Sequence, residues 1–382
     1  MNNFDRGNSR LIVIYSSYKP NTAPTNRLLS FLKGFDEHGM KVEMVFIYPN
    51  YDCSRIDETY QNINVKYLWD GHRKGGKLLK YIRSFWDVWC YVRKINEGSN
   101  VFIYGSKEYV PFFTKRKNIR VFHERTEHYN VVKIQPRFLQ KAYKKSLSKL
   151  KGMFVISTAL RNAYLQAGVR SVEIINMTVD STRFVDLKKQ PQETKYVAYC
   201  GTASNNKDGV DDLIKAFAIV HREVPSLKLL IIGRAPTRGD ESGNVELVHQ
   251  LSLGDSVVFK GVVPASQMPQ ILKNAEILAL ARPDSLQARY GFPTKLGEYL
   301  LTENPVVVTK VGDIPLFLED GKSALLAEQH NPEDFAAKIL WALKHEEEAR
   351  MIGQEGAKVA MREFNYKIET EKIINTIFSE GR

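Results

Sequence analysis

Residues 196–222 read YVAYCGTASNNKDGVDDLIKAFAIVHR and contain one complete strand–loop–helix unit. The first five residues are mainly apolar or aromatic, as in a buried strand, and a glycine follows them directly. From residue 210 onward, apolar side chains recur at the three- and four-residue spacing of an amphipathic helix. A strand that leads through a short polar loop into a helix is the building unit of a parallel α/β sheet.

The same alternation of short apolar runs and helical patterns extends in both directions from this unit. It predicts strands at residues 11–15, 42–47, 101–104, 153–156 and 172–175, and again at 196–200, 227–232, 257–259, 277–281 and 306–309. Helices are predicted at residues 24–38, 76–95, 210–222, 268–274, 294–302 and 332–344. The polar segment DLKKQPQET, residues 186–194, has no periodicity and predicts a linker.

We therefore expect an α/β protein with two Rossmann-like, doubly wound parallel-sheet domains that face a cleft. The N-terminal domain is expected at residues 1–187 and the C-terminal domain at 188–364. A final helix at 365–382 is expected to pack back toward the N-terminal domain. Because such sheets bind ligands at the carboxyl ends of their strands, the loops that follow the strands are the candidate site.

Composition excludes several classes of protein. A hydrophobic share of 43% in 382 residues is ample for buried cores, and no apolar run approaches the length of a membrane span. The polar start MNNFDRGNSR does not resemble a signal peptide, so we expect a cytoplasmic protein. Cys53, Cys90 and Cys200 form no CxxC pair or zinc spacing and are expected to be reduced thiols without a metal.

Positive charge is concentrated in the first half of the chain. Residues 1–190 contain 33 Lys and Arg against 16 Asp and Glu, a net charge of +17, whereas residues 191–382 contain 22 against 27, a net charge of −5. A basic half indicates a polyanion or an anionic membrane as a partner. No RNP-like, KH or zinc-finger pattern is present, so we expect no nucleic acid partner.

Two basic stretches of that half favour a peripheral membrane site. In HRKGGKLLKYIRSFWDVWCYVRKI, residues 72–95, the helical apolar stripe consists of Leu78, Ile82, Phe85, Trp86, Trp89 and Val92. The basic side chains beside it are Arg73, Lys74, Lys77, Lys80 and Arg83. In residues 133–152, an exposed face is expected to carry Lys141, Lys144, Lys145 and Lys149. The alternative is that both stripes pack on the sheet and the lysines only solvate the surface.

Two loops have features of anion sites, although the sequence has neither a GxxxxGK[ST] loop nor a complete GxGxxG. After the strand at 196–200, Gly201 permits close backbone approach and Lys207 can supply charge to a phosphate. Farther along, Pro293 starts a helix whose amides at Thr294, Lys295 and Leu296 can hold a diphosphate. Glu298, one turn into that helix, is suited to the paired hydroxyls of a ribose. The alternatives are an ordinary surface loop and a glutamate that only complements the helix dipole.

Six blocks of the second half resemble, in order and spacing, the donor domain of the family-four retaining glycosyltransferases with the GT-B fold (glycosyl transferases group 1). They are YCGTASNNKDGVDDLIKAF (199–217), LKLLIIGRAP (227–236), VVFKGVV (257–263), ILKNAEILALARP (271–283), GFPTKLGEYLLTENPVVVT (291–309) and VGDIPLFLEDGKSALL (311–326). The first half resembles the acceptor domain more loosely, through residues 15–42 and INMTVDSTRF (175–184).

This resemblance implies roles for individual residues. Glu298 would bind the nucleotide ribose, Lys207 would neutralise the donor diphosphate, and the amides at 294–296 would hold its distal phosphate. His123 would lie near the transferred sugar, a role for which Glu124, Glu127 and His128 compete. The expected donor-binding residues are Gly201, Thr202, Lys207, Arg234, Tyr290, Pro293, Thr294, Lys295, Leu296 and Glu298. The first-strand loop that faces donor and acceptor consists of Asn21, Thr22, Ala23, Pro24 and Thr25.

The sequence departs from the family pattern at three places. Tyr290 stands where the first glutamate of the paired-glutamate motif is expected, so a carboxylate near the reacting carbon is missing there. A basic partner for Lys207 is absent from the 200–207 loop, and the candidates to replace it are Arg234, Arg282 and Arg289. Glu303 occupies a position that is commonly glycine, which favours Asn304 as the left-handed residue after the helix.

Taken together, the resemblance implies transfer of a sugar from a nucleotide-sugar, UDP- or GDP-linked, to a saccharide or lipid-linked acceptor with retention of configuration. Catalysis would involve His123, Lys207 and Glu298 and no metal or other cofactor, because no DxD-like motif is evident. The expected location is the cytoplasm, with peripheral binding to the inner face of the membrane. The alternatives are a nucleotide-sugar epimerase or hydrolase of the same fold, an inactive nucleotide-sugar-binding homologue, and a nucleic-acid-binding protein that uses the basic half.

Overall fold

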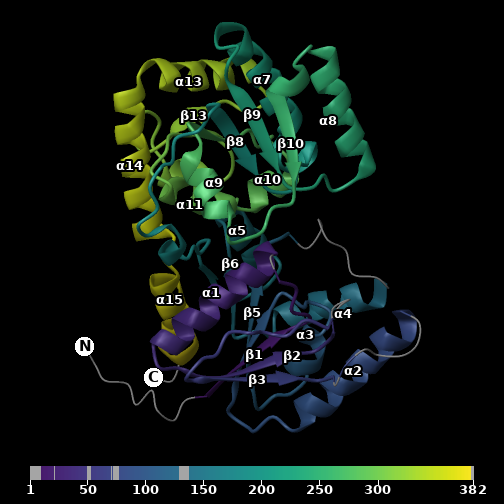
Figure 1. The fold of residues 1–382 in the computed structure, drawn as a ribbon. Helices are drawn as coiled ribbons and strands as arrows, with labels where there is room; N and C mark the ends of the chain where they lie inside the picture. Colours follow the sequence, from purple (N-terminus) through teal and green to yellow (C-terminus); the bar gives the residue numbers. More distant parts are fainter. Residues whose placement is uncertain are drawn as a thin grey trace. The chain divides into compact units, whose positions relative to one another are not determined.

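The computed structural model describes residues 10–20, 22–49, 53–69, 71, 77–128 and 137–379. The chain divides into two compact units: unit 1 is Met1–Asn176 with Tyr366–Arg382, and unit 2 is Met177–Asn365 (Figure 1). The first crossing therefore lies at 176/177, before the position expected from the polar linker. The second crossing brings the C-terminal segment back into unit 1.

Unit 1 is built on a parallel sheet in the order β3-β2-β1-β4-β5-β6-β7. Its central strand β4 (Asn100–Tyr104) is buried at every residue, as expected for a strand covered on both faces. The other strands are β1 (Arg10–Tyr15), β2 (Lys41–Phe46), β3 (Ile63–Tyr67), β5 (Arg120–Arg125), β6 (Gly152–Val155) and β7 (Val172–Ile174).

Helices cover both faces of this sheet (Figure 1). In α1 (Ala23–Glu37), Leu28, Phe31, Leu32 and Phe35 recur at helical spacing and are completely buried in the core of unit 1. The last helix, α15 (Tyr366–Ser379), packs beside α1. The remaining helices of unit 1 are α2 (Lys77–Arg93), α3 (Val110–Thr114), α4 (Arg137–Leu147) and α5 (Thr158–Gln166).

Unit 2 repeats the plan with a parallel sheet in the order β10-β9-β8-β11-β12-β13. The strands are β8 (Tyr196–Cys200), β9 (Lys228–Ile232), β10 (Val257–Gly261), β11 (Ile277–Leu280), β12 (Val306–Thr309) and β13 (Leu325–Ala327). In each unit the strand order reverses direction beside the first strand, between β1 and β4 and between β8 and β11. Ligands of open α/β sheets bind at the carboxyl ends of the strands at such a point.

The helices of unit 2 surround its sheet (Figure 1). They are α6 (Asn205–Asp208), α7 (Val210–Glu223), α8 (Arg238–Gln250), α9 (Met268–Asn274), α10 (Leu286–Tyr290), α11 (Lys295–Leu301), α12 (Ile314–Phe317), α13 (Pro332–Lys344) and α14 (Glu346–Glu363). Two 3₁₀ turns, η1 (Ser181–Phe184) and η2 (Gly254–Ser256), complete the unit. The fold class expected from the sequence, two Rossmann-like parallel-sheet domains, is confirmed.

The turn after α11 differs from the expectation. Glu303 itself adopts the left-handed conformation, with φ of 61°, so the assignment of that role to Asn304 was wrong. The reason lies in side-chain bonds on both residues. Glu303 pairs with Lys273 at 3.0 Å, while the Asn304 amide donates to the carbonyl oxygens of Leu272 and Lys273 at 3.0 and 2.9 Å. Left-handed backbone costs a non-glycine residue roughly 1–2 kcal/mol, which these contacts offset in part.

Among the described residues, no helix combines the length and the apolar character that crossing a bilayer requires.

Candidate functional site

The loop after β8 approaches its neighbours so closely that glycine is required at two positions. Gly201 has φ of +145°, and a Cβ there would collide with the side-chain nitrogen of Lys295. Gly233, after β9, has φ of +126°, and its Cβ would collide with the carbonyl oxygen of Gly201. Backbone without side chains therefore lines the carboxyl ends of β8 and β9, as in a loop that admits a phosphate.

Lys295 supplies the positive charge next to this loop. Its Nζ lies 2.5 Å from Asp208 Oδ2 and 2.9 Å from the Tyr199 hydroxyl, and it sits over the Tyr199 ring, 4.4 Å from the centroid. The Lys295 side chain is 16% exposed and Asp208 only 1%. The lysine therefore reaches from the start of α11 across to the first loop, with its charged end against Gly201.

A second buried cation, Arg282, accompanies this pair. Arg282 is 1% exposed and its charge acts on Asp208. Burial alone would raise the pKa of the Asp208 carboxyl, but the charges of Lys295 and Arg282 outweigh burial and lower it. Asp208 is thus ionised at neutral pH, and two cations share one carboxylate. The cluster carries a net positive charge at the carboxyl end of β8, which favours an anionic ligand.

Glu298 lies on the same short helix as Lys295. One contact fixes the position of the helix, and a second fixes the Glu298 side chain. The Tyr299 hydroxyl accepts a hydrogen bond from the Cys200 amide at 2.5 Å, which ties α11 to the end of β8. The Glu298 carboxylate itself pairs through Oε1 with Nη1 of Arg183, from η1. Its side chain is 25% exposed, so it remains reachable from solvent.

Other residues expected at the donor site have less specific surroundings. Lys207 is partly exposed in α6, where its amide donates to the Ser204 hydroxyl at 3.3 Å. Thr202 and Arg234 are exposed, Tyr290 and Thr294 are half-buried, and Pro293 is buried. The amide of Leu296 donates to the Pro293 carbonyl oxygen at 3.0 Å and so is not free for a phosphate, contrary to expectation.

The three arginines considered as partners of Lys207 also receive distinct environments. Arg289 is exposed and bonds Asp284 through two nitrogens, each at 2.5 Å, and Arg234 extends into solvent. Arg282 is buried and its charge acts on Asp208. The side chain of Lys295 instead provides the second cation. Sequence reasoning selected Lys295 for its amide and overlooked both its side chain and Asp208.

In unit 1, the loop after β1 is closed by its own hydrogen bonds. The Thr22 hydroxyl bonds the Thr25 hydroxyl at 3.0 Å, and the Pro24 carbonyl oxygen accepts from the Tyr104 hydroxyl at 2.8 Å. Ala23 and Pro24 are exposed and Thr25 is buried, whereas Asn21 lies outside the described residues.

His123 lies inside β5, and it is completely buried. Its Nε2 contacts the Gly105 carbonyl oxygen at 2.5 Å and its Nδ1 lies 3.4 Å from the Tyr143 hydroxyl. Burial lowers the pKa of the imidazole to about 3, so the ring is neutral. Both ring nitrogens are engaged within unit 1. The next residue, Glu124, is also buried and pairs with Arg27 at 3.4 Å.

The charge partners of this site come from distant parts of the sequence. Arg183 lies 115 residues before Glu298, and Asp208 lies 87 residues before Lys295. A signal for Arg183 was present in the block INMTVDSTRF, which also begins the resemblance to the family. Asp208 carried a weaker signal, as an acidic residue directly after Lys207 in the loop.

The second half of the chain matches a known family of proteins. Residues 182–359 match the model of the family described as glycosyl transferases group 1. A D-inositol 3-phosphate glycosyltransferase of Segniliparus rotundus is 27% identical over 209 residues, which are 52% of this chain and 45% of that protein. A mannosylfructose-phosphate synthase of Agrobacterium fabrum is 26% identical over 53% of this chain and 44% of its own length. The matches thus span less than half of these relatives.

Solved structures are similar over nearly the whole chain. Anabaena HepE, in complex with UDP-glucose, has a TM-score of 0.74 at 14% identity and covers 97% of this chain and 99% of its own. A variant of S. aureus TarM, in complex with fondaparinux, alpha-GlcNAc-glycerol and UDP, has a TM-score of 0.73 at 15% identity and covers 97% and 100%. The two units therefore have the GT-B fold that the resemblance implied, and residues 182–359 match the glycosyl transferases group 1 family.

Proposed function

We propose that this protein is a glycosyltransferase that takes a sugar from a nucleoside-diphosphate donor bound at unit 2. The observation that carries the proposal is the cluster of Lys295, Arg282 and Asp208. The charged end of Lys295 lies against Gly201, and Glu298 is on the same helix as Lys295. The cations suit the diphosphate, the glycine backbone lets it approach, and the carboxylate suits the ribose. The family match over residues 182–359 supports the same assignment.

The names of similar proteins support a UDP-linked donor and a saccharide acceptor, and a GDP-linked donor is the alternative that the family resemblance leaves open. HepE was solved with UDP-glucose, and TarM with UDP and alpha-GlcNAc-glycerol. The named acceptors or products of the two curated relatives are phosphorylated polyols or sugars. A saccharide or lipid-linked acceptor of a cell-surface polysaccharide is the corresponding proposal for this chain.

Catalysis would consist mainly of stabilising the departing diphosphate. As the bond between the sugar C1 and the diphosphate oxygen breaks, negative charge grows on the diphosphate, and Lys207 and Lys295 would stabilise it. Because these side-chain cations can fill the role of a divalent metal, we infer a metal-independent reaction. Following the family resemblance, the bond from C1 to the acceptor oxygen would form on the same face, with retention of configuration.

The test combines donor screening with product analysis. A thermal-shift screen with UDP-, GDP-, ADP- and dTDP-sugars should single out one donor, which at about 100 times its Kd stabilises by roughly 2.7 kcal/mol. With that donor, nucleotide release should require an acceptor, be unaffected by EDTA, and give a product with the donor's anomeric configuration in early NMR spectra. Release without acceptor would indicate a hydrolase, and binding without turnover an inactive homologue. Absence of binding to any donor would contradict the proposal.

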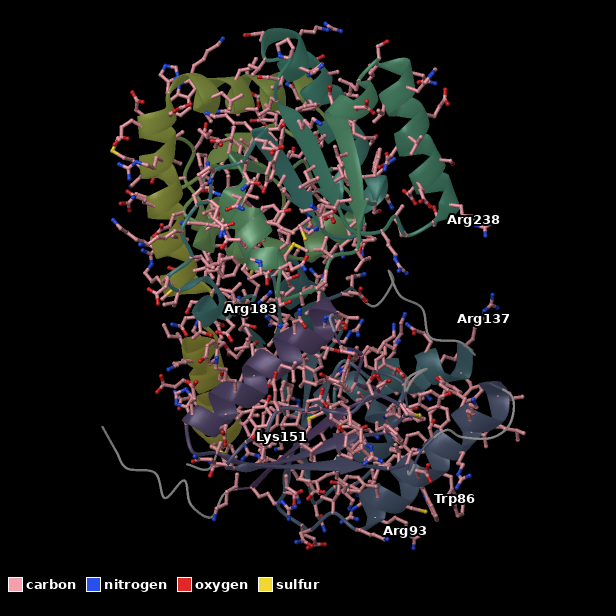
Figure 2. The ribbon with its side chains drawn as sticks, in the orientation of Figure 1. Trp86, Arg93, Arg137, Lys151, Arg183 and Arg238 are labelled. Atoms are coloured by element: carbon pink, nitrogen blue, oxygen red, sulfur yellow. The ribbon has the colours of Figure 1, made fainter. Side chains whose placement is uncertain are left out.

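We further propose that the acceptor is met at an anionic membrane surface on the cytoplasmic side, through α2. Leu78, Leu79, Ile82, Trp86 and Trp89 are 72%, 64%, 55%, 62% and 40% exposed, and Trp86 projects from α2 into solvent (Figure 2). They form a stripe along one side of the helix, an arrangement typical of interfacial helices.

The other face of α2 packs inside unit 1, so the predicted stripe divides in two. Val88 and Val92 are buried, and Phe85 stacks on Phe112 with ring centroids 5.5 Å apart. Arg93 sits over the Trp89 ring, 4.6 Å from its centroid, and Arg83 is exposed. On α4 and the turn after it, Lys141, Lys144, Lys145 and Lys149 are exposed as expected. Arg73 and Lys74 lie outside the described residues.

Vesicle binding tests this surface. The full chain should co-sediment with anionic but not neutral vesicles, more weakly at high salt, because each basic residue near an anionic leaflet contributes about 1 kcal/mol. Trp86→Ser and Leu78→Ser together should reduce binding at least about tenfold, since each inserted side chain contributes roughly 1.5–3 kcal/mol. Leu316→Ser is the matched control, because Leu316 in unit 2 is 70% exposed. Equal losses in both variants, or no binding at low salt, would contradict a role for α2.

A further inference from the structure

We propose that Arg183 positions the Glu298 carboxylate, which binds the ribose. Arg183 thereby determines how strongly the site prefers a ribonucleotide to its 2′-deoxy form. This inference rests on the proposed function, in which Glu298 accepts hydrogen bonds from the ribose. It adds a residue from the segment where the chain enters unit 2, 115 residues before Glu298.

The Glu298 carboxylate is held through one of its two oxygens. Its Oε1 bonds Nη1 of Arg183, whereas its Oε2 has no hydrogen-bond partner among the described residues. A carboxylate that is held through one oxygen and open at the other can accept from a hydroxyl without losing its protein contact. Glu298 is 25% exposed, so a ligand can reach it.

Arg183 is itself held in place. Its other terminal nitrogen, Nη2, donates to the carbonyl oxygen of Ala265 at 3.1 Å, so both ends of the planar guanidinium are fixed. The η1 turn that carries it begins with a cap, because Asp180 Oδ1 accepts from the Thr182 amide at 3.1 Å and from the Thr182 hydroxyl at 2.6 Å. Arg183 thus reaches Glu298 from a defined turn.

The segment before η1 lies against α11, the helix that bears Glu298. A Cβ at Gly297 would collide with the side chains of Met177 and Val179, so the two segments are in direct contact. Val179 also donates its amide to the Phe364 carbonyl oxygen at 3.0 Å. The turn and the helix therefore share one packed interface, and the pair at its edge sets the direction of the carboxylate.

A purely structural reading makes a different prediction for this pair. Arg183 and Glu298 are 34% and 25% exposed, and an ion pair at that exposure stabilises a fold only weakly. As a structural contact it would affect all ligands of unit 2 alike. As a positioning contact it would affect specifically the binding of the ribose hydroxyls. The ratio of the affinities for a ribonucleotide and for its 2′-deoxy form distinguishes the two interpretations.

The experiment measures the affinities of the full chain for UDP and 2′-deoxy-UDP by calorimetry, or for GDP and 2′-deoxy-GDP if GDP binds more tightly. Wild type should prefer the ribonucleotide about tenfold, the size expected for one hydrogen bond to a charged group. Arg183→Gln should reduce this ratio to about two or less and leave the 2′-deoxy affinity nearly unchanged. Arg183→Lys should recover part of the ratio because it keeps the charge.

The matched control is Arg350→Gln, which removes an exposed arginine that pairs with Glu347 on α14. Its nucleotide ratio should equal that of wild type, and melting curves should show that all variants are folded. An unchanged ratio in Arg183→Gln, or a loss that is the same for both nucleotides, would overturn the positioning role while leaving the proposed function intact. If no nucleoside diphosphate binds wild type, the proposed function fails and this inference fails with it.

Discussion

Replacing Lys295 by methionine should separate its structural contribution from its binding contribution. The substitution keeps most of the side-chain volume but removes the cation 2.5 Å from Asp208. Asp208 is 1% exposed, so its carboxylate would stay buried, with Arg282 as the main remaining cation and Lys207 as a weaker one. Breaking a buried pair from one side costs about 3–5 kcal/mol, and the remaining Arg282 places the expected loss near the lower end, about 3 kcal/mol.

A second substitution removes the stranded charge. In Lys295→Met/Asp208→Asn, both members of the pair are neutral, so most of the lost stability should return. Donor affinity should not return, because the cation that faces Gly201 is still missing. We expect UDP, or whichever donor nucleotide binds wild type, to bind at least about tenfold more weakly to both variants.

Urea unfolding and calorimetric titration measure the two effects, and pH provides an independent check. The folded pKa of Asp208 lies below its ordinary value of 3.8 because Lys295 and Arg282 outweigh burial. The stability that this carboxylate contributes is therefore present above about pH 4 and lost as pH falls through the lower folded pKa. The advantage of wild type over Lys295→Met should shrink in that acid range. Wild-type nucleotide affinity in the double variant, or an undiminished free energy of unfolding in the single one, would refute the reasoning.

Three further predictions concern single positions. Glu298→Gln should weaken nucleotide binding about tenfold through the ribose, while urea unfolding changes by less than about 1 kcal/mol because its pair with Arg183 is partly exposed; unaltered affinity would remove Glu298 from the site. Glu303→Gly should raise the free energy of unfolding by up to about 1 kcal/mol. The reason is that relief of the left-handed strain exceeds the loss of the partly exposed pair with Lys273. A lower free energy of unfolding would contradict this. Burial lowers the folded pKa of His123 to about 3, so stability is fully present above about pH 6.5 and falls toward pH 3. His123→Phe should make the free energy of unfolding in urea depend less on pH across this range. An unchanged pH dependence would refute the prediction.

Sequence patterns were sufficient for the strands that are continuously apolar and insufficient for the others. β3, at the edge of its sheet, has one buried residue followed by alternating exposed and half-buried ones, and β13 has three residues, so neither forms a clear apolar run. β5 contains His123, Glu124 and Arg125, all buried, a composition that local propensity does not favour in a strand. Its burial depends on Arg27, which lies 97 residues earlier and pairs with Glu124. Such a pairing forms only in the folded chain, so local sequence patterns do not reveal it.

The candidate site shows the same division between local and distant information. Glycine at position 201 and glutamate at position 298 could be selected because each has a local reason, a turn and a helix start. The direction of the Lys295 side chain could not, because it depends on Asp208 being buried opposite it. His123 was selected by resemblance as a residue near the transferred sugar, but it lies within β5, where it pairs with Ile103 of β4 and is completely buried.

The return of the chain to unit 1 at Tyr366 has a consequence for the order of folding during synthesis. Unit 2, residues 177–365, is an insertion within unit 1, and the core of unit 1 includes Ile373, Ile374 and Ile377 from α15. Ribosomes release the chain from its N-terminus, so every residue of unit 2 has emerged before unit 1 can close its core. Domains generally fold as units as they emerge. In this protein unit 1 is the first unit to be synthesised and the last to complete its fold. Until α15 has been synthesised, the apolar face of α1 that α15 covers is exposed to solvent or bound by a chaperone.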